Sequence, residues 1–526
     1  MRTMFCAMIC LLKATLRPLI HRIIRGSSPE STFLSKKHNR NSKAQMHLIV
    51  RHQTETSRTS GMLLHQNSST QIIKELKTGK LTAHQLAQNQ LDRIRRLNPK
   101  INAIVATDDT LRGNVSGPLS GLPITLKDQI HYQGMKCTFG SEHHKDFCPS
   151  STAPVVEKLA NAGAHIIGKT NLPPFAMDFQ CSNPLFGTSN NPWNLDYTTG
   201  GSSGGGAAAV AAGLSFLDIG TDLSGSLRIP ASFCGVFSLL PTENSLPNEG
   251  MMAGGTAPLK HFARMGPIAR TAEDLDLAWA HMGDHSGPEE DFIMPDVFWS
   301  VDGAGIEVCA EITHSFATAT HAWEAAGFHI RQQQPENFDF RRARRAFGEI
   351  MGFETGALMP APIRLIARIF GRASARRSPE FIANVMLGYR HSQKHYDAAR
   401  VEKRILSAAV DAFLGDNGVW VLPVTASSVF KHMLPTSDRN GVRDYANPLY
   451  INGQPANYFD AMTLFVTPIS LTGHPVVTFP LGLDGNGLPI GVQLIGKKGR
   501  EKHLIQTAKL LHSCLDKGDC PMLMTE

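Results

Sequence analysis

The sequence predicts an α/β fold: a single α/β/α sandwich domain around a large mixed β-sheet. Short apolar runs recur along the chain, with helical stretches between several of them. The runs are continuous rather than alternating, which is typical of strands buried on both faces. With 526 residues, 42% of them apolar, the chain is long enough to bury such a sheet. We expect strands at residues 101–106, 122–126, 164–167, 214–219, 419–424, 476–481 and 490–495.

Two helices are expected between residues 67 and 98, close to the first strand. Gly79 suits the end of the first helix, because glycine tolerates a left-handed backbone. Thr82 followed by Gln85 forms a capping-box pattern for the start of the second helix. This second helix is expected to stop before Pro99, since proline lacks the backbone donor that a helix needs.

Further helices are expected at 153–162 and 207–212, and a looser helical region at 286–400. Nine arginines lie between residues 341 and 377, with only Glu349 and Glu354 among the acidic residues of that stretch. Such a cluster suits an anionic ligand, a solvated helix face or a contact with a partner. The pattern alone leaves these alternatives open, although a solvated face or a partner contact is the commoner case.

The positive charge of the chain belongs to a basic leader at residues 1–61. Residues 1–60 carry 11 Lys and Arg against two acidic residues, a net charge of +9, whereas the rest carries 41 against 43. No nucleic-acid partner is therefore expected. The leader fits a mitochondrial presequence, a membrane-associating helix, or a disordered upstream extension with Met46 or Met62 as the working start. Its apolar start is interrupted at Lys13, short of the roughly 20 residues that span a bilayer.

Cysteine usage indicates a reducing compartment. The nine cysteines are odd in number and include no CxxC pair, which argues against a disulfide framework. We expect a cytoplasmic protein, or a mitochondrial one if the leader is a presequence, with membrane association only through that leader. No Cys/His/Asp cluster has metal-ligand spacing, so no metal or other cofactor is expected.

Two serines stand on Gly/Ser turns at either end of one helix-then-strand unit. Ser202 lies in GGSSGG and Ser226 in TDLSGS, and Lys127 closes the apolar run GLPITLK. A serine hydroxyl needs a base such as histidine, and no G-x-S-x-G nucleophile elbow surrounds Ser226. A buried lysine can act as that base, because desolvation disfavours its ammonium form. The pattern therefore predicts a Ser-Ser-Lys catalytic site formed by Ser226, Ser202 and Lys127.

Each of these motifs has a plainer interpretation. GGSSGG alone fits a flexible linker, and Gly204, Gly206 and Ala209 match a dinucleotide-binding fingerprint. That fingerprint requires a strand directly before the glycines, whereas NNPWNLDYTT is turn-like. Lys127 alone could reach water along its own stem.

Taken together, four separated motifs favour a catalytic site over these plainer interpretations. In chain order they are GLPITLKD, CSNPLFGTSNNPWN, GGSSGG and GTDLSGSLRIPASFCGV. In this combination the chain resembles the amidase signature family, and CSNPLFG is similar to the fatty acid amide hydrolase branch. The likeness continues through MGPIARTAEDL, SLTGHPVVTFPLG and GLPIGVQLIG and covers about residues 62–526, least well at 286–400. The resemblance implies that 62–526 is an amidase signature catalytic domain, in which 286–400 is a variable helical region that covers the substrate.

The resemblance also implies roles for single residues. Lys127 matches the family's catalytic lysine, Ser226 its nucleophile, and Ser202 the bridging serine, whose peptide bond is typically cis. Backbone N–H groups of Leu223, Ser224 and Gly225, with that of Ser226, would form the oxyanion hole.

Supporting roles follow in the same way. Asp222 and Arg228 match positions that brace the loop of the nucleophile, and an ordinary structural ion pair is compatible with that role. Ser203 would hydrogen-bond nearby without a proton-transfer step of its own.

The chain departs from the family pattern at two positions. Ser224 stands where a glycine belongs; if that position needs a positive φ, a serine would cost on the order of 1 to 2 kcal/mol and distort the oxyanion hole. Gly206 stands where serine or glutamate is common, and we expect this change to be harmless at a helix start.

The function that the resemblance implies is hydrolysis of a carboxylic amide to acid and amine or ammonia, with a small-molecule amide as substrate. Two alternatives remain. One is the A subunit of the glutamine-dependent tRNA amidotransferase, although LLPTENSLPNEG lacks the LKPTYG-like sequence of that protein. The other is a non-catalytic amidase-like binding protein, suggested only by Ser224. A homodimer is one candidate assembly.

Overall fold

The computed structural model describes residues 64–110, 116–251, 261–283, 291–303, 305–357, 362, 379–390, 392–435, 445, 447–515 and 521. The leader predicted at 1–61 lies outside the described residues, as do five of the nine arginines, from Arg364 onward.

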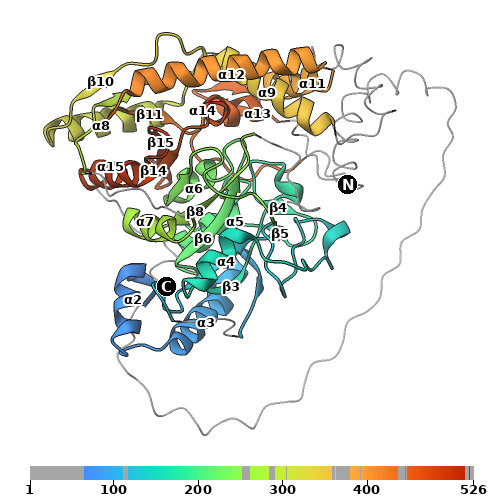
Figure 1. Ribbon diagram of the computed structural model, residues 1–526, viewed down its shortest axis with the longest axis vertical. Coiled ribbons are helices and arrows are strands. Elements are labelled where there is room, and N and C mark those ends of the chain that lie inside the picture. The colour runs from blue at the N-terminus through green and yellow to red at the C-terminus, as the bar shows by residue number, and fades with distance from the viewer. Residues whose placement is uncertain are drawn as a thin grey trace, which may run out of the picture.

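An 11-stranded sheet runs through the molecule in the order β1-β3-β2-β6-β8-β7-β14-β15-β11-β9-β10 (Figure 1). Its strands are β1 (Ile104–Thr107), β2 (Pro123–Lys127), β3 (His165–Thr170), β6 (Leu217–Asp222), β7 (Phe237–Leu240), β8 (Arg264–Ala269), β9 (Val297–Trp299), β10 (Ile330–Gln332), β11 (Val419–Pro423), β14 (Val476–Leu483) and β15 (Pro489–Ile495). β2 pairs in parallel with β3 and β6, whereas β6 pairs antiparallel with β8. The predicted mixed sheet is therefore confirmed.

All seven predicted apolar runs form strands of this sheet, whereas β7, β8, β9 and β10 were not predicted. β8 has the sequence RMGPIA, in which Arg, Gly and Pro interrupt the apolar run by which a buried strand is predicted. It is nevertheless buried throughout, because it lies between β6 and β7 near the middle of the sheet. Two short pairs lie outside the sheet: β4 (Ser182–Asn183) with β5 (Gly187–Thr188), and β12 (Leu449–Ile451) with β13 (Gln454–Ala456).

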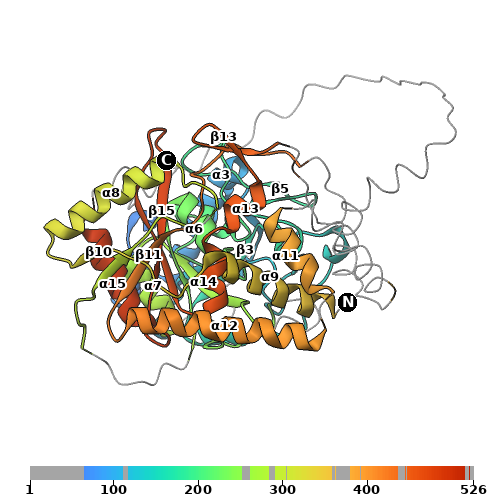
Figure 2. The same cartoon turned by 90° about the horizontal axis from the view of Figure 1, so that it is seen from above.

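Helices cover both sides of the sheet (Figure 2). They are α2 (Ser69–Lys77), α3 (Ala83–Ile101), α4 (Pro154–Asn161), α5 (Gly204–Ala211), α6 (Arg228–Cys234), α7 (Ala272–Ala280), α8 (Ala310–Ala325), α9 (Phe340–Gly356), α11 (Glu380–Gly388), α12 (Gln393–Leu414), α13 (Tyr458–Thr463), α14 (Val466–Thr472) and α15 (Glu501–Ser513). Gly491 of β15 lies against α6, since a Cβ there would be 2.7 Å from the Cα of Ser232. The neighbouring register position, where Val492 pairs with Phe479, faces α15: the Phe479 ring lies 6.3 Å from that of His512. Because side chains alternate along a strand, α6 and α15 pack on opposite faces.

The first helices follow the predicted local signals, with one correction. Thr82 and Gln85 form the predicted capping box, with the Gln85 N–H donating to Thr82 Oγ1 at 3.1 Å. Gly79 has a φ of +72° just after α2, as predicted. However, α3 continues through Pro99 to Ile101. A proline in the last turn removes only one N–H donor, so the prediction that the helix stops before it was wrong.

The described part of 286–400 is largely helical, as predicted, with α9 packed against α11, α12 and α14. Three arginines of α9 have carboxylate partners. Arg342 lies 2.8 Å from Glu402, Arg344 lies 3.2 Å from Glu380, and Arg345 lies 2.8 Å from Glu349. These pairs favour a structural role for this part of the cluster over an anionic ligand.

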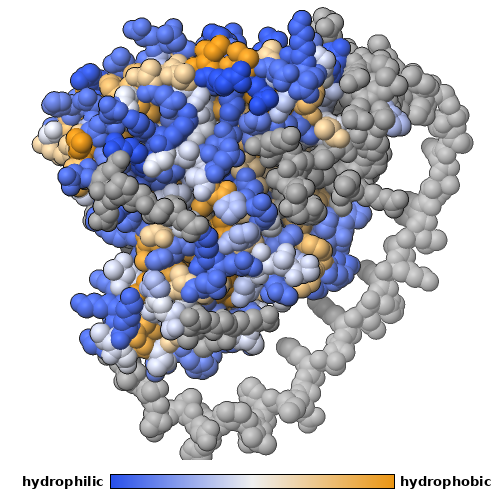
Figure 3. All heavy atoms as spheres, in the orientation of Figure 1, coloured by the Kyte–Doolittle hydropathy of each residue, from blue (hydrophilic) through white to orange (hydrophobic). Residues whose placement is uncertain are grey.

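The face of the molecule drawn in Figure 3 is mainly hydrophilic, with an apolar patch at the top over α12. Val401 and Ile405 of α12 are 43% and 48% exposed. Among the residues that the structure describes, no helix has the length and apolar character needed to span a membrane.

Candidate active site

Lys127 ends β2, a strand in the interior of the sheet, and its side chain is fully buried. Its Nζ lies 2.6 Å from Ser202 Oγ, 3.0 Å from Ser203 Oγ and 3.0 Å from Thr221 Oγ1. The structure thus brings together three residues that the sequence singled out. It adds Thr221, which sequence reasoning missed although it stands directly before Asp222 in the TDLSGS motif.

The surroundings of Lys127 favour its neutral form. Burial lowers the pKa of its amine from 10.5 to about 7, and nearby Cys181, Asp222 and Asp218 act in the opposite direction. Desolvation is the larger effect because the charged ammonium loses its hydration in a dry interior. A substantial fraction of Lys127 is therefore a free amine near pH 7, and a free amine can accept a proton.

Ser202 lies on the turn before α5, where the Gly201–Ser202 peptide bond is cis, as the family resemblance implied. The next residue connects this turn to that of Ser226: the Ser203 N–H donates to the Ser226 carbonyl oxygen at 3.1 Å. Ser203 Oγ also donates to the Thr221 carbonyl at 3.2 Å. These bonds fix the two serine-bearing turns relative to each other.

Ser226 lies between the end of β6 and the start of α6 and is 6% exposed. Within the described part of the chain, its hydroxyl makes no hydrogen bond with another residue. The N–H groups of Leu223, Ser224 and Ser226 likewise donate to no described residue, so all three are available to an oxygen placed beside the turn.

Two expectations for this turn need correction. Ser224 does not have a positive φ; the following Gly225 does, with a φ of +114°. The strain expected at Ser224 is therefore not present. In addition, the Gly225 N–H donates to Asp222 Oδ1 at 2.7 Å. Because the Asp222 carboxylate occupies this N–H, the expected set of oxyanion donors narrows to Leu223, Ser224 and Ser226.

Asp222 and Arg228 form a fully buried ion pair under the turn. Arg228 Nε and Nη2 each lie 3.1 Å from an Asp222 oxygen, and the Leu227 N–H also donates to Asp222 at 3.0 Å. Burial opposes ionisation of Asp222, but Arg228 and these hydrogen bonds outweigh it and hold the pKa of the carboxyl below its usual value. The pair braces the loop that carries Ser226.

Arg228 extends this brace to the C-terminal part of the sheet. Its Nη1 donates to the Val466 carbonyl at 2.9 Å and to Gln493 Oε1 at 3.0 Å, and its Nη2 donates to Ser470 Oγ at 2.6 Å. Segments more than 230 residues apart are thus joined at one guanidinium.

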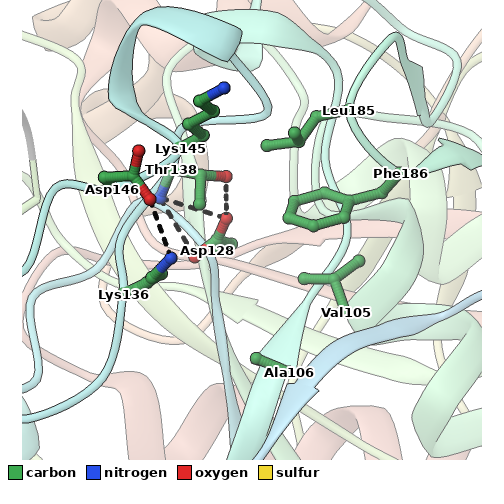
Figure 4. Close-up of a pocket in the computed structure, with 9 residues that line it drawn as sticks. All are labelled: Val105, Ala106, Asp128, Lys136, Thr138, Lys145, Asp146, Leu185 and Phe186. Carbon is green, nitrogen blue, oxygen red and sulfur yellow. Dashed lines mark hydrogen bonds and ion pairs between the residues drawn. The ribbon is translucent and has the colours of Figure 1, made fainter.

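A cavity of about 290 Å³ opens beside β1 and the loop after β2 (Figure 4). Asp128 and Thr138 meet on one of its walls, Lys136 and Asp146 form an ion pair 2.9 Å long, and Phe186 contributes an apolar side. Burial raises the pKa of Asp128 to about 6. Asp128, the neighbour of Lys127 in the chain, lines this cavity, whereas Lys127, Ser202 and Ser226 do not.

Comparison with known proteins places the chain in a family. The Amidase family profile matches residues 85–505. The A subunit of the glutamyl-tRNA(Gln) amidotransferase of Carboxydothermus hydrogenoformans is 30% identical, with 85% of this chain and 97% of that protein covered. The protein of the same name from Cyanothece sp. is 29% identical, with 83% and 96% covered.

Solved structures show the same fold. A 6-aminohexanoate cyclic dimer hydrolase bound to its substrate matches with a TM-score of 0.70 at 24% identity, over 87% of this chain and 99% of that one. A bacterial aryl acylamidase of the amidase signature family matches with a TM-score of 0.69 at 20% identity, over 85% and 96%. The chain therefore belongs to the amidase signature family, as its motifs predict, and is an amidase, an enzyme class that acts on linear amide C–N bonds.

Proposed function

We propose that this protein hydrolyses carboxylic amides through an acyl-Ser226 intermediate, with Ser202 and Lys127 transferring protons. The observation that carries the proposal is the fully buried Lys127 Nζ at 2.6 Å from Ser202 Oγ. An amine whose pKa is lowered to about 7 and that lies at this distance is a suitable base for a serine hydroxyl.

In the acylation half of the reaction, Lys127 accepts the proton of Ser202 while Ser202 takes the proton of Ser226. Ser226 Oγ then bonds to the carbonyl carbon of the amide. The N–H groups of Leu223, Ser224 and Ser226 hold the oxygen that becomes negative, a contribution typically worth about 3 kcal/mol for each donor.

The tetrahedral intermediate then breaks its C–N bond. The leaving nitrogen takes a proton from Ser202, and Ser202 regains one from Lys127. A water molecule attacks the acyl-Ser226 ester, gives its proton to the same relay, and releases the carboxylic acid. The original hydroxyl of Ser226 and the neutral amine of Lys127 are restored.

Two substrate classes are candidates, and the curated relatives favour the second. The first is a free small-molecule amide. The second is glutamine as a source of ammonia, with this chain working as the A subunit of a tRNA amidotransferase, the name carried by relatives that match nearly along their whole length. Partner subunits belong to that second function. The non-catalytic alternative loses its only support, because Ser224 does not have the strained backbone that suggested it.

The test is a hydrolysis screen over short-chain, aryl and long-chain amides and glutamine. Wild type, Ser226→Ala and Lys127→Ala are compared, with Ser232→Ala of α6 as a matched control for loss of a buried serine. We expect both site variants to lose at least about a hundredfold in kcat while remaining folded, and the control to retain activity. Equal turnover by wild type and Ser226→Ala would rule the mechanism out. Ammonia release from glutamine only when partner subunits are added would select the amidotransferase function over a free amidase.

A further inference from the structure

Asp218 is an ionisable residue near the start of β6 and is fully buried. Its Oδ1 accepts hydrogen bonds from Thr125 Oγ1 at 2.8 Å and from Thr170 Oγ1 at 3.0 Å. Its Oδ2 has no hydrogen-bond partner among the described residues. Burying a carboxyl with only half of its acceptors satisfied is costly, and the mechanism above assigns Asp218 no role.

The first turn of α5 leaves room for this carboxyl. A Cβ at Gly206 would lie 2.0 Å from Asp218 Oδ2 and 2.5 Å from its Cγ, closer than atoms can approach. A larger residue at this position would collide with the Asp218 carboxyl, whereas Gly206 leaves space for it. That the glycine is harmless at this helix start stays a prediction.

Asp218 and Lys127 lie on the same face of the sheet. Asp218 pairs in register with Thr125 of β2, and Thr125 and Lys127, two residues apart, point to the same side. The other titratable groups around the pair are Lys169 of β3, Asp222 of β6 and Cys181, while α5 contributes none.

The pKa values of the two groups are shifted toward each other. Burial raises the pKa of Asp218 to about 7, against the opposing effects of its two threonines and of Lys127 and Lys169. Burial lowers the pKa of Lys127 to about 7, and Asp218 in turn acts to raise it. An ionised Asp218 favours the ammonium of Lys127, so the charge of one group depends on that of the other.

We propose that Asp218 is a positioning residue for Lys127, one that acts through its charge to set the pH at which Lys127 becomes the free amine. The inference rests on the proposed function, because it concerns the lysine that acts as base there. Removing the negative charge of Asp218 lets Lys127 lose its proton at a lower pH. The reaction of Ser226 should then begin at lower pH as well.

The test measures the rate at which a fluorophosphonate labels Ser226 as a function of pH. In Asp218→Asn, which keeps the shape and removes the charge, we expect the acidic limb of the profile to move about one pH unit lower. Asp274→Asn is the matched control. Asp274 of α7 is another buried carboxyl with a raised pKa and an unpartnered Oδ2, but it is not among the charged neighbours of Lys127. The acidic limb of the Asp274→Asn profile should coincide with that of wild type.

A second variant covers the case in which Asp218→Asn does not fold. Gly206→Ser/Asp218→Ala removes the same charge, and the new serine side chain on α5 fills the space that the Asp218 carboxyl occupied. It should fold and show the same shift. A folded variant without Asp218 whose acidic limb coincides with those of wild type and Asp274→Asn would overturn the inference. Failure of wild type to be labelled at Ser226 would instead overturn the proposed function.

Discussion

Replacing Arg228 by methionine should strongly destabilise the protein, because it leaves a buried charge without its partner. The change deletes five hydrogen bonds, two to Asp222 and one each to Val466, Gln493 and Ser470. Asp222 would keep only two backbone N–H donors in a fully buried site. Breaking a buried ion pair in this way typically costs about 3 to 5 kcal/mol.

The assay is the free energy of unfolding from urea titration, with Arg342→Met as the control. Arg342 is paired with Glu402, but its side chain is 55% exposed, so its loss should cost less than about 1 kcal/mol. The double variant Asp222→Asn/Arg228→Met should lose less free energy of unfolding than the two single variants lose together, since it also removes the unpaired charge of Asp222. A loss below about 1 kcal/mol for Arg228→Met would refute the view that this pair holds the loop that carries Ser226.

Three further predictions follow from the site. Activity of wild type should rise with pH through an apparent pKa of about 7, because Lys127 must lose its proton to act as base; a flat kcat/KM profile between about pH 5.5 and 8.5 would contradict this. Gly225→Ala should lower the free energy of unfolding by about 2 to 4 kcal/mol, because its φ is +114° and Val466 Cγ2 would lie 2.8 Å from the new Cβ, whereas Ser224→Gly should change it by less than about 1 kcal/mol. Calorimetry that ranks these two substitutions in the reverse order would show that the turn has been misassigned. Gly206→Ala should be destabilising alone and tolerated together with Asp218→Ala, which thermal melts of the single and double variants would reveal.

Much of the sheet could be predicted because its strands are buried on both faces and read as unbroken apolar runs. The exceptions have physical reasons. β8 is interrupted by Gly266 and Pro267, and β9 and β10 are only three residues long. The end of α3 was misplaced because a single proline in a last turn costs one hydrogen bond, which does not end a helix.

The candidate site was predicted in its main members but not in its surroundings. Lys127, Ser202 and Ser203 could be named from motifs, and they cluster in space. The engagement of the Gly225 N–H by Asp222 depends on loop geometry that no sequence pattern specifies. Asp218 did carry a signal, an acidic residue inside the apolar strand LSFLDIG, and its relation to Gly206 became visible only once α5 was placed over β6.

Mass spectrometry of the enzyme quenched during turnover of a hydrolysed amide tests the acyl-Ser226 intermediate directly. We expect an acyl adduct on the peptide that contains Ser226 in wild type, and no adduct there in Ser226→Ala. An adduct on a different residue, or steady hydrolysis by Ser226→Ala at the wild-type rate, would contradict it.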